Sequence, residues 1–127
     1  MLVNWTLQPI GKGWDVEPDA VVWVDVALIE ASFAQDPDSY LGVAGAGNGQ
    51  RSRYDRVGSH ISSGRAIWMP LVVLGDGHQI HFTDGRHRFA WVRDHAAAAL
   101  PVATDPGRAG DLAVIFGTTL RECKVVC

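Results

Sequence analysis

Short apolar runs alternate along the chain with stretches in which apolar residues recur every three or four positions. The first run, Val21–Val24, is β-branched and aromatic, which predicts a strand. Asp25 can cap a helix predicted by the spacing of the next apolar residues, and the Asp36-Pro37 pair should end that helix. The first third of the chain therefore predicts a strand that leads directly into a helix.

A glycine-rich stretch separates this unit from a second helical repeat. Residues 42–50 carry four glycines and no regular apolar spacing, which predicts a mobile loop. Tyr54, Val57 and Ile61 then recur at helical spacing. Gly64 is placed to end this second helix in a left-handed conformation.

Two strand-like runs follow, joined by a Gly-Asp-Gly turn at residues 75–77. Met69–Leu74 is almost continuously apolar, whereas His78–Thr83 alternates apolar and polar positions. Together they predict a β-hairpin. The helical repeat behind the hairpin should begin at Arg86 and run to about Ala97.

Two further elements complete the predicted fold, a short strand at Leu100–Thr104 and a helix at Asp111–Phe116. This order of elements predicts an α+β class, with a mixed sheet that contains a hairpin and packs against helices. The strand and helix periods predict that five apolar side chains lie in the core. These are Val72, Ile80, Phe82, Phe89 and Val102.

The composition fits one globular domain over residues 1–127. Hydrophobic residues make up 47% of the chain, and no run is long and apolar enough to span a membrane. The start lacks the basic and apolar segments of a secretory signal. Cys123 and Cys127 have no further cysteine or histidine partners nearby, which favours free thiols in a reducing compartment. We therefore expect a cytoplasmic protein with no membrane insertion.

The formal net charge of −3 is unevenly distributed. Residues 1–50 carry −6, residues 51–108 carry +3, and the remainder is balanced. Eight of the nine arginines lie in the middle block. The planar guanidinium suits two-pronged contacts with phosphate or carboxylate, so this chain is too acidic to coat nucleic acid but can present one basic face.

Three common kinds of site find no support. Gly42 and Gly47 have the spacing of a P-loop, but the lysine that reaches the phosphates is missing, which favours a surface loop or a lid. His78 and His81 are three apart on a predicted strand and point to opposite faces, so they cannot chelate one metal ion. No G-x-S-x-G elbow occurs, which argues against nucleophilic catalysis.

Charge is concentrated in one strand-to-helix turn, within the stretch FTDGRHRFAW at residues 82–91. Gly85 is expected to adopt a conformation that a β-carbon would strain, which frees the backbone to approach a ligand. The first N–H groups of the helix carry the positive end of its dipole. Arg86, His87 and Arg88 add donors for phosphate oxygens. The turn thus combines three features of a phosphate site.

Asp84 leaves two interpretations of this turn open. Its carboxylate can orient an arginine or hold Mg²⁺ beside a phosphate. It can also be the N-cap of an ordinary polar turn, whose arginines pair on the surface with Asp55 or Asp94.

The stretch from SGRAIWMPLVV to IHFTDGRHRFAWVRDHAAAALPVAT resembles the core of the ParB/sulfiredoxin superfamily. The shared pattern is a helix ending in glycine, a strand starting with proline, a hairpin, a [D/G]-G-x-x-R turn opening a helix, and a Leu-Pro-Val strand. VVWVDVALI occupies the place of the family's opening strand and helix, so the resemblance spans residues 20–105. Within the superfamily the motif is similar to that of plasmid fertility-inhibition factors, which suppress conjugative DNA transfer.

The resemblance implies that the turn binds the phosphates of ATP or another nucleotide. It implicates Gly85, Arg86, His87 and Arg88 in phosphate binding, and Asp84 as the partner of a metal ion or an arginine. The sequence departs from the family pattern at two places, and each departure argues against one of the family's activities. Arg86 stands where sulfiredoxins carry their catalytic cysteine, and the sequence stops at Cys127, before a ParB-type DNA-binding region. Sulfinic-acid reduction and centromere binding are therefore not expected.

A triphosphate carries more negative charge than a helix dipole and one arginine compensate. We therefore expect Arg88 to converge on one concave, electropositive patch with at least one of Arg51, Arg53, Arg56 or Arg65. Of these, Arg56 and Arg65 are named as further phosphate-binding candidates. Arg88 is expected to be exposed, so that its loss would weaken binding and change stability little.

The favoured hypothesis is a fertility-inhibition-type factor that binds a nucleotide or the DNA backbone and has Mg²⁺-dependent ATPase or DNase (nuclease) activity. Asp84, His87 and Arg88 are its candidate catalytic residues, and Asp84 its candidate metal ligand. One alternative is a non-catalytic protein that blocks a component of the conjugation or secretion machinery, and five tryptophans favour such a binding surface. Another is a small-molecule kinase of the same fold.

Overall fold

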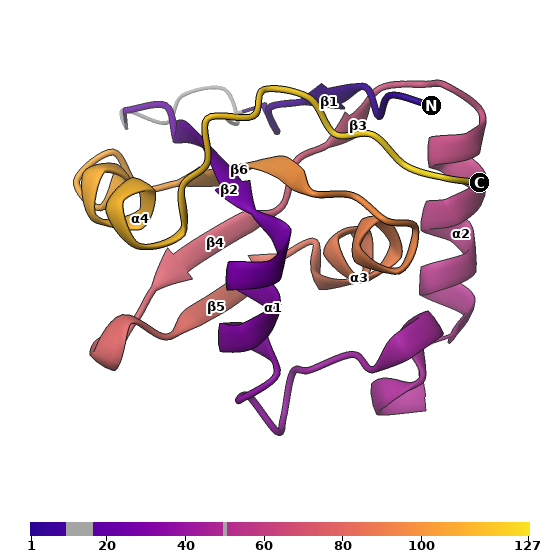
Figure 1. Ribbon diagram of the computed structural model, residues 1–127, viewed down its shortest axis with the longest axis horizontal. Helices are drawn as coiled ribbons and strands as arrows, with labels where there is room; N and C mark the ends of the chain where they lie inside the picture. The colour runs from indigo at the N-terminus through magenta and orange to yellow at the C-terminus, as the bar shows by residue number, and fades with distance from the viewer. Residues whose placement is uncertain (10–16, 50) are drawn as a thin grey trace.

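An early strand and a late strand pair with each other in the sheet. In the computed structural model, which describes residues 1–9, 17–49 and 51–127, β2 (Ala20–Asp25) runs antiparallel to β6 (Ala99–Thr104). β4 (Leu71–Leu74) joins β6 in parallel, and β5 (Ile80–Asp84) runs antiparallel to β4. The order β2-β6-β4-β5 is a mixed sheet that contains the predicted hairpin (Figure 1). The α+β class is confirmed.

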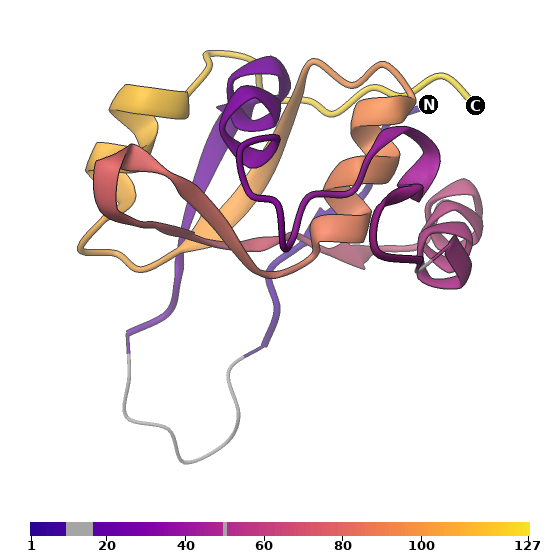
Figure 2. The ribbon, with the colours of Figure 1, turned by 90° about the horizontal axis from the view of Figure 1, so that it is seen from below.

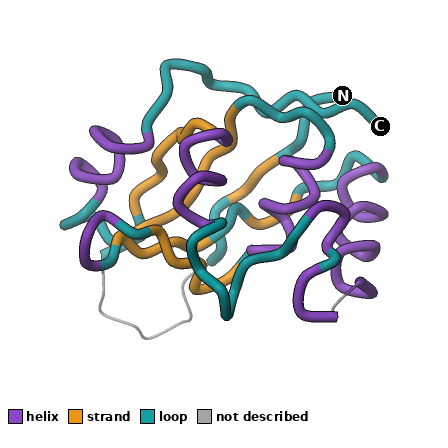
Figure 3. The backbone as a smooth tube through the Cα atoms, turned by 60° about the horizontal axis from the view of Figure 1, so that its bottom comes forward, coloured by secondary structure: helices purple, strands orange, loops and turns teal. Residues whose placement is uncertain are grey.

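The described residues form four α-helices beside this sheet. They are α1 (Val26–Phe33), α2 (Arg51–Ser62), α3 (Arg86–Asp94) and α4 (Ala109–Phe116). Short 3-10 turns occur at η1 (Val43–Gly45), η2 (Gly47–Gly49) and η3 (Asp76–His78). The strands gather in the middle of the molecule, with α2 beside α3 at one end and α4 at the other (Figures 1 and 3).

Helix α1 begins where its sequence places a cap. The Asp25 carboxylate accepts the backbone N–H of Leu28 at 3.0 Å, so the predicted N-cap is confirmed. Phe33, at the other end of α1, packs edge-on against Phe82 of β5 and Phe89 of α3, with ring centroids 4.8 and 5.8 Å apart. This aromatic cluster joins α1 and α3 on the same face of the sheet (Figure 2).

The predicted core is largely confirmed. Val72, Ile80, Phe89 and Val102 are buried, whereas Phe82 is half-buried and packs on the core through its ring. All six residues of β6 are buried because that strand has a neighbour on either side and packed side chains on both faces.

Two predicted boundaries are wrong. The strand predicted over Met69–Leu74 starts two residues later, as β4, after Pro70. The short strand before it, β3 (Ile67–Trp68), was not predicted and pairs in parallel with β1 (Trp5–Thr6). Helix α3 ends at Asp94 instead of Ala97, because Ala96 turns to a left-handed φ of 68°. The left-handed Gly64 at the end of α2 is as predicted.

The two ends of the described chain lie side by side (Figure 1). The Met1 ammonium donates to the carbonyl of Val125 at 2.8 Å, and the N–H of Val3 donates to that of Cys123 at 2.9 Å. Cys123 is buried and Cys127 exposed, and both are free thiols. Over the residues described, none of the helices has the length and apolarity needed to cross a membrane.

Candidate functional site

The turn between β5 and α3 is built around Gly85. Leu71 lies opposite Asp84 but Val72 lies opposite Phe82, so Thr83 is an extra residue that bulges the end of β5. Gly85 adopts a left-handed φ of 91°, and a β-carbon there would lie 2.7 Å from the Cα of Pro70. Only glycine fits without strain, and α3 begins directly after it, both as predicted.

This turn borders a cavity of about 750 Å³ between α2, β3 and the first turn of α3. The volume lies within the range of small-molecule sites, roughly 300–1,000 Å³. Among the described residues, four arginines line the cavity, and Asp84 supplies the one carboxylate. The polar and aromatic lining residues are Arg53, Arg56, Ser59, His60, Arg65, Trp68, Asp84, His87 and Arg88.

Six of the seven candidate residues named from the sequence meet at this cavity. They are Arg56, Arg65, Asp84, Gly85, His87 and Arg88. Arg86 is the exception, since it opens α3 without lining the cavity. Arg53, which was expected among the arginines that could converge with Arg88, also lines the cavity. His60 and Trp68 were missed, and for Trp68 the only signal in the sequence is its place just before the Met-Pro pair. The roles of these residues in binding or catalysis stay predictions.

Arg88 is held at the base of the site by Asp84. Its Nη2 lies 3.0 Å from Asp84 Oδ2, one helical turn away, and only 12% of the arginine side chain is exposed. Its Nε is buried and has no hydrogen-bond partner among the described residues. The expectation that Arg88 is exposed is therefore wrong, and part of its donor capacity is unused.

The N-cap of the polar turn offered as the alternative interpretation is not observed, because Gly85, not Asp84, is the N-cap of α3 and no side chain caps this helix. Asp55 lies 3.0 Å from Arg51, and Asp94 lies 3.0 Å from Arg93. An ordinary polar turn, in which Arg88 pairs with Asp84, stays open as the alternative to a phosphate site.

His87 is the second residue in the site with unused capacity. It is 9% exposed, and its Nε2 is buried without a hydrogen-bond partner in the described part of the chain. Burial lowers the pKa of His87, the charges of Arg86, Arg53 and Arg88 lower it further, and Asp84 opposes them. The imidazole is therefore neutral at pH 7 and can accept a proton or share a hydrogen bond with a ligand.

The donor set suits an anion and not a protein-held cation. Nowhere in residues 1–9, 17–49 and 51–127 do three His, Cys, Asp or Glu side chains gather around a point where a metal could bind. Asp84 is ion-paired with Arg88, and the other charged groups that line the cavity are arginines, which repel Mg²⁺. Phosphate oxygens, by contrast, match both the arginines and the N–H groups that open α3.

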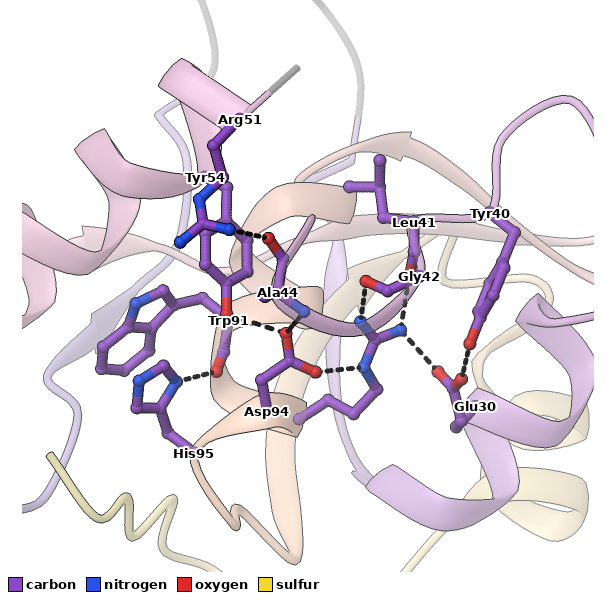
Figure 4. Close-up of polar contacts among 11 residues, drawn as sticks. Glu30, Tyr40, Leu41, Gly42, Ala44, Arg51, Tyr54, Trp91, Asp94 and His95 are labelled. Atoms are coloured by element: carbon purple, nitrogen blue, oxygen red, sulfur yellow. Dashed lines mark hydrogen bonds and ion pairs between the residues drawn. The ribbon is translucent and has the colours of Figure 1, made fainter. Parts of the chain in front are cut away.

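A separate polar network occupies the other end of α3 and was not predicted. Arg93 Nη1 lies 2.9 Å from Glu30 Oε2, and Arg93 Nε lies 3.0 Å from Asp94 Oδ1. The guanidinium also donates to the carbonyls of Leu41 and Gly42, at 2.8 and 2.9 Å (Figure 4). The start of the glycine-rich loop is thus tied to α3.

The same network holds the next residues of the loop. Asp94 Oδ2 accepts the N–H of Ala44 at 2.6 Å and the hydroxyl of Tyr54 at 2.8 Å, and Arg51 donates to the carbonyl of Ala44 at 3.0 Å (Figure 4). Burial and the bond to Asp94 raise the pKa of Tyr54, so its hydroxyl stays protonated and donates. The loop is thus held by hydrogen bonds at the end of α3 opposite Gly85. The mobile loop or lid expected over residues 42–50 stays a prediction, and residue 50 lies outside the described residues.

The sequence matches no protein-family model and is not similar to any curated protein. One solved structure resembles this one, that of the oncogenic suppression activity protein, a plasmid fertility inhibition factor, as its gold(I) cyanide derivative. The TM-score is 0.60 at 20% sequence identity, over 93% of this chain and 78% of the other. The likeness establishes a shared fold. Membership of the broader ParB/sulfiredoxin superfamily stays a prediction.

Proposed function

We propose that this protein binds phosphate groups of a nucleotide or nucleic acid in the cavity at the start of α3, as a factor of the fertility-inhibition type. One observation carries the proposal. Four arginines converge on a cavity whose buried Arg88 Nε and His87 Nε2 have no partner in the described protein. Buried polar groups are nearly always hydrogen-bonded. An acceptor oxygen of a ligand would satisfy Arg88 Nε, and a water bound beside that ligand would donate to His87 Nε2.

The positions of the arginines suggest that they would contact different parts of the ligand. Arg88 and the first N–H groups of α3 would hold one phosphate, because the turn at Gly85 brings the backbone close to the cavity. Arg53 and Arg56 are exposed on α2 and would contact neighbouring phosphates from the far side. Arg65, on the loop after α2, would close the remaining edge.

The site also has the parts for hydrolysis of a phosphodiester or a phosphoanhydride. His87 is neutral at pH 7 and would accept a proton from a water that attacks phosphorus, while Arg88 would stabilise the charge that develops on the phosphate. As the bond from phosphorus to the leaving oxygen breaks, His87 would return the proton to that oxygen. Because the donor set does not fit a protein-held Mg²⁺, no step of this proposal depends on that ion. ATPase and DNase activity both follow from this arrangement as hypotheses.

The fertility-inhibition role rests on the fold likeness together with the FTDGRHRFAW motif. Such a role means suppression of conjugative DNA transfer, either through action on DNA at this cavity or through a component of the transfer machinery. Transfer frequency of a conjugative plasmid in cells that express the wild type or a cavity variant distinguishes the two. An inhibitor that acts through its cavity loses suppression with the cavity arginines, whereas one that blocks a protein partner elsewhere keeps it.

The direct test is a double variant, Arg53→Ala with Arg56→Ala, because both side chains are exposed and their loss should leave the fold intact. We expect each lost contact to weaken binding of ATP or a DNA oligonucleotide about ten-fold at low salt, measured by fluorescence anisotropy. Arg108→Ala is the matched control, since Arg108 is half-exposed and pairs with Asp111 away from the cavity. Equal affinity in wild type, double variant and control would refute the proposal.

A further inference from the structure

One aromatic side chain stands at the rim of the cationic cavity. Trp68 lines the cavity and is 44% exposed, whereas its neighbour in β3, Ile67, is 6% exposed. The alternation of the strand explains the difference, because successive side chains point to opposite faces. Trp68 is thus the large aromatic group that the described lining offers to a ligand.

The backbone holds this tryptophan in place. The N–H of Ile67 donates to the carbonyl of Asn4 at 2.9 Å, and the N–H of Met69 donates to that of Thr6 at 2.8 Å. These two bonds of the parallel β1–β3 pair flank Trp68 on both sides. Little ordering entropy would then be lost when a ligand contacts the indole.

The chemistry of the lining identifies what this indole can contact. Inorganic phosphate would use the arginines but gain nothing from an exposed aromatic face. A nucleobase stacks on an aromatic side chain, and cationic grooves combined with such platforms bind single strands. Arg53, Arg56 and Arg65 line the same cavity as Trp68, so one nucleotide unit can reach both kinds of group.

We infer that Trp68 is a stacking platform for an unpaired nucleobase whose phosphates lie on the arginines of the same cavity. The inference rests on the proposed phosphate site and specifies its ligand. In a duplex each base is paired and stacked on its neighbours, so it is not available to the indole. The site therefore takes a nucleotide in a single strand, or a free nucleotide, in preference to duplex DNA.

The test measures anisotropy of labelled oligonucleotides of equal length at low salt, with the full chain. One is oligothymidylate, one is an abasic strand with the same number of phosphates, and one is a duplex. Wild-type protein should bind oligothymidylate about ten-fold or more tightly than the abasic strand, because stacking adds to the charge contacts. Trp68→Ala should remove this difference and leave abasic binding unchanged, and Trp68→Phe should keep most of it.

Competition separates the two sources of an unpaired base. ATP that displaces the labelled strand better than inorganic tripolyphosphate indicates a site that also accepts a free nucleotide. Equal displacement by ATP and tripolyphosphate, with the Trp68 effect retained on oligothymidylate, indicates that the base must be part of a strand. Either pattern supports stacking on Trp68.

Two further outcomes overturn the inference. The first leaves the proposed phosphate site standing, and the second refutes that site as well. If oligothymidylate and the abasic strand bind equally and Trp68→Ala changes neither, stacking is refuted while phosphate binding stands. If no strand, nucleotide or polyphosphate binds, the proposed phosphate site fails and stacking fails with it. Thermal melting of each Trp68 variant checks that the fold is retained.

Discussion

The two ends of α3 carry the same side chain in opposite states. At the C-terminal end, Arg93 is 10% exposed, and its Nε, Nη1 and Nη2 all donate to carboxylates or carbonyls. At the N-terminal end, Arg88 is 12% exposed, yet it has one ion pair and a buried Nε without a partner in the described chain. Burial is nearly equal and hydrogen bonding is not.

This contrast is the basis on which we propose a ligand-binding role for Arg88 and a structural role for Arg93. A buried donor that stays unsatisfied costs free energy, so a fold that needed Arg88 only for packing would be expected to satisfy it, as it does Arg93. The unused donor belongs to Arg88, whose side chain lines a cavity, whereas the donors of Arg93 bind a loop and two carboxylates. Whether the buried donors have hydrogen-bond partners therefore distinguishes these two arginines more clearly than their charge or their burial does.

The largest effect is expected at Arg93. Arg93→Met should lower the free energy of unfolding by about 3–5 kcal/mol. The substitution removes the guanidinium that pairs with Glu30 and donates to the carbonyls of Leu41 and Gly42. Urea denaturation measures the change. Arg108→Met, which breaks a half-exposed ion pair, should cost about 0–1 kcal/mol. A similar small cost for both variants would show that the network does not hold the fold.

Arg88 should show the reverse balance between binding and stability. Arg88→Ala should weaken phosphate binding by about 1.5–3 kcal/mol, or ten- to hundred-fold, because it removes a charge-assisted contact. Its cost in unfolding free energy should be smaller than that of Arg93→Met, because fewer protein groups lose a partner. A sharp loss of stability with unchanged phosphate affinity would show that Arg88, like Arg93, has a structural role.

Gly85 tests how the turn positions Arg88. Gly85→Ala should cost about 1–2 kcal/mol for the left-handed backbone alone, with an added cost for the close approach to Pro70. Gly77→Ala is the matched control, because Gly77 has a φ of 66° with open space around its Cα. The difference between the two melting points isolates the packing cost. Identical melting points would show that Pro70 moves freely out of the way.

The smallest effect is a pH dependence that involves His87. Its pKa is lowered in the folded state by burial and by Arg86, Arg53 and Arg88, against Asp84, so below about pH 6.5 the unfolded chain takes up a proton first. Wild-type stability should therefore fall as the pH drops from 7 towards 5, and His87→Gln should show a shallower fall. Parallel stability curves for the two proteins would contradict this origin of the dependence.

Local sequence signals were sufficient to predict much of the fold and the turn at the centre of the candidate site. The start of α3 behind Gly85, the cap at Asp25 and the β4–β5 hairpin each depend on neighbouring residues, so the sequence predicted them. Convergence of Arg88 with the arginines of α2 followed from an electrostatic argument that needs no geometry.

The features that the sequence did not reveal depend on long-range contacts. Arg93 finds Glu30 across 63 residues of chain, and nothing around either residue marks the pair. The β1–β3 pair that turns Trp68 towards the cavity joins two strands of two residues each, too short for a periodic signal. The partial burial of Arg88 likewise depends on packing around the turn and not on its own neighbours.

The central place of β6 has a consequence for how the chain acquires its structure. The β4–β5 hairpin is local and can form by itself, but β6, the last strand of the sheet along the chain, lies between β4 and β2. β2 has no partner strand in this sheet until β6 is in place. Val22, for example, pairs with Val102, which follows it 80 positions later in the chain. Contacts of such sequence separation slow folding. During synthesis, the exposed edges of β2 and β4 should therefore be the part of this protein most open to aggregation or to chaperones.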